Sequence, residues 1–241
     1  MNFDIVKTNI INITADAIVL PANEHLKEGR GTSRAIFEAA GRTKLTNVCR
    51  KLGHWDVGKA VPTPAFNLKA KYIIHAVVPH WVDGNQNEYN LLSTAYLSAL
   101  NVADIMGCES IAFPLLASGN NGFDKELAIH IAKESIEHFS STHLKKVSLV
   151  IYGNHTEELI KSLGYSVIVI PDISWVHEKT PTYKFKKILD DGKDIAQKII
   201  EEQIEKAMEW LKDPEHCRQA FQYACMIVQL VFNMKKKPPH K

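Results

Sequence analysis

The sequence predicts an α/β fold in which helices cover a central sheet. From the first residues to about residue 170, short apolar runs alternate with segments whose apolar residues recur at helical spacing. Two of the junctions between a predicted strand and the next helix, near residues 20 and 115, carry glycine-containing loops. The chain has 241 residues, 45% of them hydrophobic, which suffices for one large domain or for a domain with an appendage.

The predicted elements follow the alternating order of an α/β sandwich. Strands are expected at residues 3–7, 16–20, 60–65, 71–77, 111–115, 147–152 and 166–170. Helical segments are expected near residues 33–51, where Gly41 terminates the first run, and helices at residues 88–106, 124–139 and 156–163. In the long helix at 88–106, Leu92, Tyr96 and Ala99 keep helical spacing, so one face should cover the sheet.

The pattern changes after Pro171. Residues 184–212 and the segment from Pro214 to Phe232 predict two helices with apolar faces. The chain is therefore expected to divide into a domain at residues 1–171 and a helical carboxy-terminal extension at residues 172–241. The extension either packs back on the domain or offers residues 184–232 for self-association or for a partner protein.

The first glycine-containing loop joins a strand to a helix within residues 20–41. At such a junction the free N–H groups and the helix dipole favour an anion. Gly29 and Gly31 supply bare backbone, Ser33 can cap the helix, and Asn23 can offer its amide to a sugar hydroxyl. These residues together predict a phosphate site.

The same order of strand, glycine loop and helix returns at residues 110–132. Gly119 and Gly122 flank Asn120 and Asn121, which tolerate the left-handed conformations that direct consecutive N–H groups into a concave nest. A diphosphate can be held between two such loops. The alternative interpretation is a pair of ordinary crossover turns.

Residues 1–171 resemble the macro domain family in the order and spacing of their motifs. The motifs are DAIVLPAN at 16–23, the glycine loop that ends in AIFEAAG, KYIIHAVVP at 71–79, SIAFPLLASGNNG at 110–122 and VSLVIYG at 147–153. The resemblance implies a three-layer α/β/α sandwich around a mixed central sheet. It also implies binding of ADP-ribose or a derivative, either free or linked to a protein.

The resemblance further implies a role for individual residues. Asp16, with Ala17 beside it, should bind the adenine amino group, Asn23 the distal ribose, and Tyr152 the adenine face. The loops should cradle the diphosphate through Gly29, Gly31, Thr32, Ser33, Ser118, Gly119, Asn120, Asn121, Gly122 and Phe123.

Four positions differ from the catalytic members that the chain resembles. Leu20 stands where those members often have Asn, Ser33 where many have an acidic residue, and Phe37 where a His often follows. Asn121 stands where an aromatic side chain commonly closes over the distal ribose, and Phe123 could partly replace its bulk. Binding is therefore favoured over catalysis. One alternative is an ADP-ribosyl or O-acetyl-ADP-ribose hydrolase in which a ligand phosphate helps to orient water and Asn23 positions the ribose. Another is an interaction protein that acts through its helical tail.

Composition and charge bear on which partners, compartments, metals and cofactors are expected. The net charge of +2 argues against a field that attracts nucleic acid, although KKKPPHK forms a basic tail, and no nucleic-acid partner is expected. Neither a membrane-spanning stretch nor a secretion signal is visible, so a cytoplasmic protein is expected. The four cysteines form no Cys-x-x-Cys pair and the eleven histidines are dispersed, so neither a metal site nor a cofactor is expected. His75 is interpreted as a core histidine.

Overall fold

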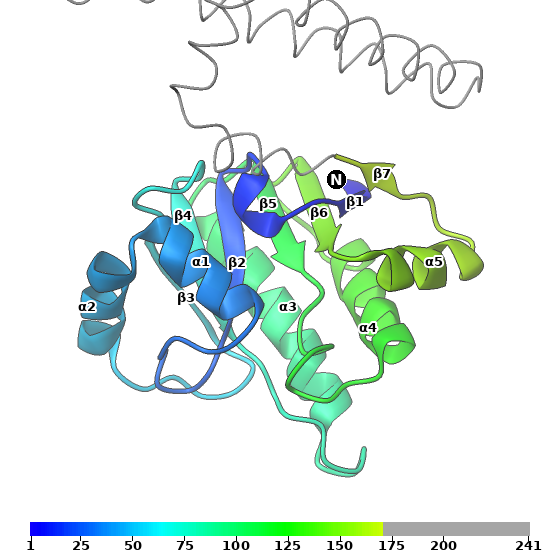
Figure 1. Ribbon diagram of the computed structural model, residues 1–241, viewed down its shortest axis with the longest axis horizontal. Coiled ribbons are helices and arrows are strands. Elements are labelled where there is room, and N and C mark those ends of the chain that lie inside the picture. Colours follow the sequence, from blue (N-terminus) through cyan, green and yellow to red (C-terminus); the bar gives the residue numbers. More distant parts are fainter. Residues whose placement is uncertain (171–241) are drawn as a thin grey trace, which may run out of the picture. The chain divides into compact units, whose positions relative to one another are not determined.

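The computed structural model describes residues 1–170, which form a sheet between two layers of helices (Figure 1). The sheet has seven strands in the order β3-β4-β2-β5-β6-β1-β7. All neighbouring strands are parallel except β3, which pairs antiparallel with β4. The expected three-layer sandwich around a mixed sheet is therefore confirmed.

The strands and helices have the following bounds. The strands are β1 (Asn2–Lys7), β2 (Ala17–Ala22), β3 (Ala60–Pro64), β4 (Tyr72–Val77), β5 (Ser110–Pro114), β6 (Lys146–Ile151) and β7 (Ile168–Val169). The helices are α1 (Thr32–Ala40), α2 (Arg42–Leu52), α3 (Glu88–Ile105), α4 (Lys125–Glu137) and α5 (Asn154–Ser162), with a short 3-10 turn η1 (Ile10–Asn12).

Each face of the sheet has its own apolar cluster. Strand β2 contributes to both clusters, because alternate side chains of a strand point to opposite faces of the sheet. Ile18 and Leu20 pack with residues of α1 and α2, whereas Val19 packs with residues of α3 and α4. All three side chains are fully buried.

The helical segments expected at residues 33–51 are two helices, and Gly41 ends the first of them as predicted, because it adopts a left-handed conformation with φ of 101°. One element differs from the prediction. The strand expected at 166–170 is reduced to the two residues of β7. The expected domain boundary at residue 171 and the helices expected beyond it lie outside the described residues. Within the described part, no helix is long and apolar enough to cross a membrane.

The topology creates a crevice at one edge of the sheet. Strands β2 and β5 are parallel neighbours. The chain leaves β2 for α1, which packs on one face, and leaves β5 for α4, which packs on the other (Figure 1). Where neighbouring strands send their connections to opposite faces, the loops at their carboxyl ends separate, and ligands bind between them.

Candidate functional site

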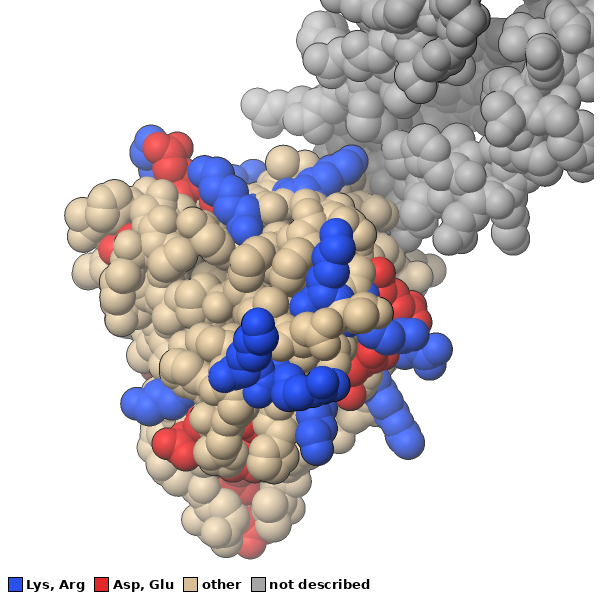
Figure 2. Space-filling view, turned by 90° about the vertical axis from the view of Figure 1, so that its left-hand side faces the viewer, with Lys and Arg blue, Asp and Glu red and all other residues tan. Residues whose placement is uncertain are grey.

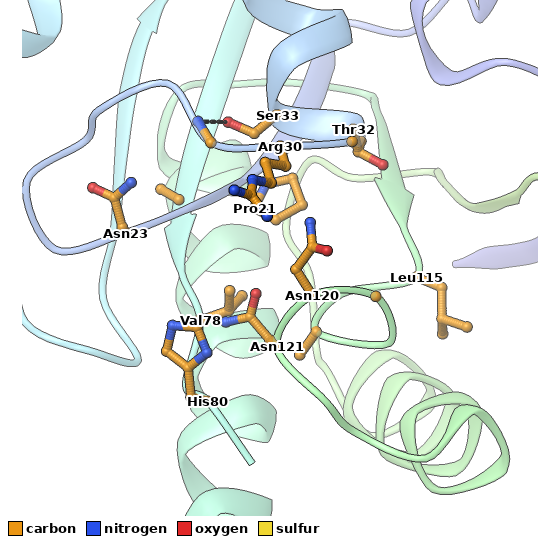
Figure 3. Close-up of a pocket in the computed structure, with 15 residues that line it drawn as sticks. Pro21, Asn23, Arg30, Thr32, Ser33, Val78, His80, Leu115, Asn120 and Asn121 are labelled. Atoms are coloured by element: carbon orange, nitrogen blue, oxygen red, sulfur yellow. Dashed lines mark hydrogen bonds between the residues drawn. The ribbon is translucent and has the colours of Figure 1, made fainter.

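A cavity of about 310 Å³ lies between the loops that follow β2 and β5 (Figure 3). Its volume is at the lower end of the range for small-molecule sites. Its lining residues are Pro21, Ala22, Asn23, Gly29, Arg30, Gly31, Thr32, Ser33, Val78, His80, Leu115, Ala117, Gly119, Asn120 and Asn121. None of these described residues is Asp or Glu, so the cavity wall carries no carboxylate.

Asn23 shapes the first loop through its own side chain. Its amide oxygen accepts the N–H groups of His25, at 3.2 Å, and Lys27, at 3.0 Å. Its Nδ2 donates to the carbonyl oxygen of Lys27 at 2.8 Å, which leaves one amide hydrogen for a ligand. The residue thus lines the cavity as predicted, but most of its hydrogen-bonding capacity holds the loop.

Ser33 holds the same loop instead of capping the helix from outside. It lies inside α1, and its hydroxyl oxygen accepts the N–H of Gly29 at 3.0 Å. The residue that precedes α1 is Gly31, whose φ of 57° favours glycine. The first turn of α1 has no side-chain cap and no acidic residue. Its unpaired N–H groups and the positive end of its dipole therefore favour an anion in the cavity.

Arg30 adds a positive charge to this wall. Figure 3 shows its side chain projecting from the first loop into the cavity, toward the loop that carries Asn120. Within the described residues, Arg30 has no ion pair with an acidic side chain, and it is the one Lys or Arg of the lining. A guanidinium in this position can form charge-assisted hydrogen bonds to a phosphate.

The second loop presents only part of its predicted phosphate contacts. Gly119, Asn120 and Asn121 line the cavity. The N–H of Gly122 donates to the carbonyl oxygen of Gly119 at 3.1 Å, and the N–H of Phe123 donates to that of Ala117 at 3.2 Å. These two N–H groups are therefore engaged within the loop.

The structure does not bring Ser118, Gly122 and Phe123 to the cavity wall. The Ser118 hydroxyl donates to the carbonyl oxygen of Leu115 at 3.1 Å. The Phe123 ring is buried and meets the Trp81 ring edge to face, with centroids 5.1 Å apart. Phe123 therefore supports the loop from the core and does not close over a ligand.

A third segment, residues 79–84, completes the wall and was not predicted. Asn121 fixes it, because its Nδ2 donates to the carbonyl oxygen of Pro79 at 2.9 Å and its own carbonyl oxygen accepts the N–H of Trp81 at 2.8 Å. His80 lies between these contacts and lines the cavity (Figure 3).

Glu88 holds the following residues in place from the start of α3. The buried carboxylate accepts N–H groups of Val82, Asp83, Gly84 and Gln86. Burial alone would raise the pKa of Glu88, but the backbone hydrogen bonds outweigh it and lower the pKa to about 2. The residue therefore stays ionised and keeps the turn beside the cavity closed.

A second hollow of about 360 Å³ continues the cavity along the sheet edge. It shares Gly31 and Thr32 with the first, and Asn9 and Tyr152 also line it. The Tyr152 ring is 74% exposed, so its face is open to a ligand. The sequence pointed to Tyr152 but not to Asn9, whose side chain caps η1 by accepting the N–H of Ile11.

Asp16 and Ala17 lie away from both hollows. They stand at the amino-terminal end of β2, whereas the cavity lies beyond its carboxyl end, about 20 Å away for a strand of six residues. The Asp16 carboxylate accepts Lys71 Nζ at 2.9 Å and the N–H groups of Glu109, at 2.8 Å, and Ser110, at 3.3 Å. The hydrogen bond from Lys71 is the main cause of the lowered pKa of Asp16. The geometry gives Asp16 a structural role and removes both residues from the ligand-binding set.

Two of the positions that differ from the catalytic members of the family are buried in the apolar core. Leu20 and Phe37 are almost inaccessible, and both belong to the apolar cluster around His75. The His75 Nε2 lies 3.0 Å from the hydroxyl of Thr63 and 3.9 Å from the sulfur of Cys49. Burial lowers the pKa of His75 to about 4 and raises that of Cys49 to about 11. His75 is thus a neutral core histidine, as expected.

Among the described residues, no group of three or more His, Cys, Asp and Glu side chains is placed to hold a metal ion.

Comparison with known proteins agrees with this architecture. The family model of the macro domain matches residues 19–132. A macro domain-containing protein of Caldanaerobacter subterraneus is 40% identical over 159 residues, covering 64% of this chain and 91% of that protein. A protein of Escherichia fergusonii named O-acetyl-ADP-ribose deacetylase is 36% identical over 165 residues, covering 66% of this chain and 93% of that one.

Solved structures give the same result. A mutant macrodomain of Oceanobacillus iheyensis with ADPR has a TM-score of 0.61 and 28% identity, covering 66% of this chain and 91% of that chain. The macrodomain of the same organism with ADP has a TM-score of 0.62 and 26% identity, covering 73% and 92% of the two chains. Since the first relative has 40% identity and is covered over 91% of its length, the chain belongs to the macro domain family.

Proposed function

We propose that this protein binds ADP-ribose, or a close derivative, in the cavity between the two glycine-containing loops. The observation that carries the proposal is the lining of that cavity: Arg30 and the uncapped first turn of α1 make it positive, and no described lining residue is acidic. A diphosphate is the ligand group that matches this charge and the free N–H groups. Relatives with ADPR and ADP support the choice of nucleotide.

The two hollows indicate where the two ends of the ligand would bind. Adenine would lie in the hollow lined by Asn9 and Tyr152, where the exposed aromatic ring can stack on a base. The distal ribose would lie at the Asn23 end of the first cavity, within reach of the remaining amide hydrogen. Gly31 and Thr32 line both hollows and would carry the diphosphate between them.

Calorimetric titration with ADP-ribose, ADP and adenosine tests the proposal. We expect ADP-ribose and ADP to bind and adenosine to bind much more weakly, because only the first two carry the diphosphate. Arg30→Ala should weaken ADP-ribose binding about tenfold to a hundredfold, since a charge-assisted hydrogen bond contributes about 1.5–3 kcal/mol.

Arg34→Ala is the matched control. Arg34 follows in α1, does not line the cavity, and pairs with Glu38 on an exposed surface at 3.1 Å. Its loss should leave the affinity within about twofold. Equal effects of the two variants, or no binding of ADP-ribose to the unaltered protein, would refute the proposal.

Hydrolysis of ADP-ribosyl or O-acetyl-ADP-ribose substrates is the second candidate, which the names of relatives such as the Escherichia fergusonii protein favour. Because no described lining residue is a carboxylate, a ligand phosphate would orient the attacking water and Asn23 would position the ribose. Incubation with O-acetyl-ADP-ribose, and separately with mono-ADP-ribosylated protein, tests this candidate. If acetate or ADP-ribose is released and Arg30→Ala abolishes the release, turnover takes place at this cavity. Binding without release would instead establish a protein that recognises ADP-ribose without hydrolysing it.

A further inference from the structure

The loop that carries Asn23 at one end of the cavity lies against the loop that follows α2. The loop after β2 contacts the loop after α2, because the N–H of Trp55 donates to the carbonyl oxygen of Glu24 at 2.8 Å. The rings of His25 and His54, which belong to these two loops, lie 5.4 Å apart. Arg50 and Lys51 lie in the last turn of α2, which leads directly into the second of these loops.

The resulting surface, which we call the basic rim, consists of Lys27, Arg30, Arg50 and Lys51. All four side chains are exposed, and within the described residues none has an ion pair with an acidic side chain. Glu28 follows Lys27 in the sequence, but its carboxylate already accepts two hydrogen bonds from Arg42, at 2.7 and 2.9 Å.

Besides Glu28, the same two loops carry two acidic residues. Glu24 is exposed, and Asp56 lies 3.5 Å from the Nε2 of His54. Four basic side chains against these two leave the rim with a net positive charge. Figure 2, which views the molecule from the side of α2, shows that several Lys and Arg side chains lie on this side of the molecule.

The positive charge is local to one segment of the described chain. Residues 23–71 carry ten Lys and Arg and four Asp and Glu, whereas the rest of residues 1–170 carries six and twelve. A polyanion longer than the rim would therefore extend onto surfaces where Asp and Glu outnumber Lys and Arg, and these would repel it. This distribution favours a short anionic segment over a nucleic acid strand.

We infer that the basic rim docks an acidic segment of the protein that carries the ADP-ribose. The inference rests on the proposed function, which places the distal ribose, and hence the link to the modified protein, at the Asn23 end of the cavity. A polypeptide that leaves the cavity there passes directly over the rim. Asp and Glu side chains near the modified residue match its charge, and each exposed pair adds a modest, salt-sensitive contribution.

The experiment compares two synthetic peptides that carry the same ADP-ribosylated side chain. One has Asp and Glu on both sides of the modified residue, and the other has Gly and Ser. Affinities of the full-length protein are measured for both peptides and for free ADP-ribose, at low and at physiological salt. We expect the acidic peptide to bind about fivefold to tenfold more tightly at low salt, and salt to reduce this preference.

The test variant is Arg50→Gln combined with Lys51→Gln. The matched control is Lys44→Gln combined with Lys69→Gln, which removes the same charge at the opposite end of α2. Lys44 is in the first turn of this helix, and Lys69 follows Asn67, whose N–H donates to the carbonyl oxygen of Ala40 at 3.3 Å. The test variant should lose about fivefold in affinity for the acidic peptide only, and the control should keep it.

The outcomes separate the inference from the proposed function. Equal binding of the two peptides, with ADP-ribose binding intact, would overturn the docking inference alone. Failure of free ADP-ribose to bind would overturn the proposed function as well. Displacement of the acidic peptide by a short oligonucleotide at equal concentration, with loss of that competition in the Arg50 and Lys51 variant, would assign the rim to nucleic acid instead.

Discussion

The buried His75 predicts a specific loss of stability in mild acid. The side chain is fully buried in β4, and burial lowers its pKa from 6.5 to about 4. In the unfolded chain the imidazole takes up a proton near pH 6.5, whereas in the folded chain it stays neutral until about pH 4. Because the unfolded state binds more protons between these values, stability is complete above pH 6.5 and falls as the pH drops toward 4.

The size of this loss follows from the two pKa values. Each tenfold difference in proton affinity corresponds to about 1.4 kcal/mol. The contribution of His75 should therefore fall by about 2 kcal/mol between pH 7 and pH 5, and by about 3 kcal/mol by pH 4. Such a change is a large fraction of the stability of an ordinary domain.

Urea unfolding of the protein and of His75→Gln at pH 7 and pH 5 measures this contribution. Gln cannot titrate and can still meet the hydroxyl of Thr63, which lies 3.0 Å from the imidazole. The protein should lose about 2 kcal/mol more than the variant between the two pH values. His130→Gln, at an exposed position, should behave like the unaltered protein. Equal losses in the protein and in His75→Gln would refute the reasoning.

Three further predictions follow from other hydrogen bonds of the structure. Asp16→Asn should leave ADP-ribose affinity within about twofold and lower the free energy of unfolding by about 1 kcal/mol, because its partners are Lys71 and backbone N–H groups far from the cavity; calorimetry and urea unfolding check the two parts. Ser33→Ala frees the N–H of Gly29 and should weaken ADP-ribose binding about fivefold in calorimetry, and an unchanged affinity would contradict this role. Glu88→Gln should expose residues 82–86 to limited proteolysis at pH 7, because the carboxylate that holds this turn is lost. Since the pKa of Glu88 is lowered in the folded protein, the stability that Glu88 adds is present above pH 4.5 and is lost as the pH falls through about 2.

Most of the fold could be predicted because the signals for it are local. Helical spacing and apolar runs depend on neighbours in the sequence, and they located nearly every strand and helix of residues 1–170. The end of the first helix at Gly41 could also be predicted, because glycine favours the left-handed conformation that ends a helix. In the sheet formed by residues 1–170, β7 is an edge strand that pairs with β1 at two residues, Ile168 and Val169.

The candidate site was predictable only in part. Residues of both loops line the cavity, and glycine and Asn mark these loops in the sequence. The assignment of Asp16 disagreed with the geometry, because a residue before a strand and a loop after it lie at opposite ends of that strand. The positions of Phe123 and His80 depend on contacts between segments that are far apart in the chain, and no local pattern reports them. Glu88 bonds residues only two to six positions before it, but no motif of the sequence marks this turn.

The bonds inside the two loops have a kinetic consequence. Asn23, Ser33 and Asn121 hold the walls of the cavity through hydrogen bonds that involve no ligand. A nucleotide that arrives therefore meets N–H groups already in their binding orientation, and little backbone entropy is lost when the complex forms. Association should then follow a single concentration-dependent phase, without a slow rearrangement step, and differences in affinity among related nucleotides should reside in how long each one stays bound.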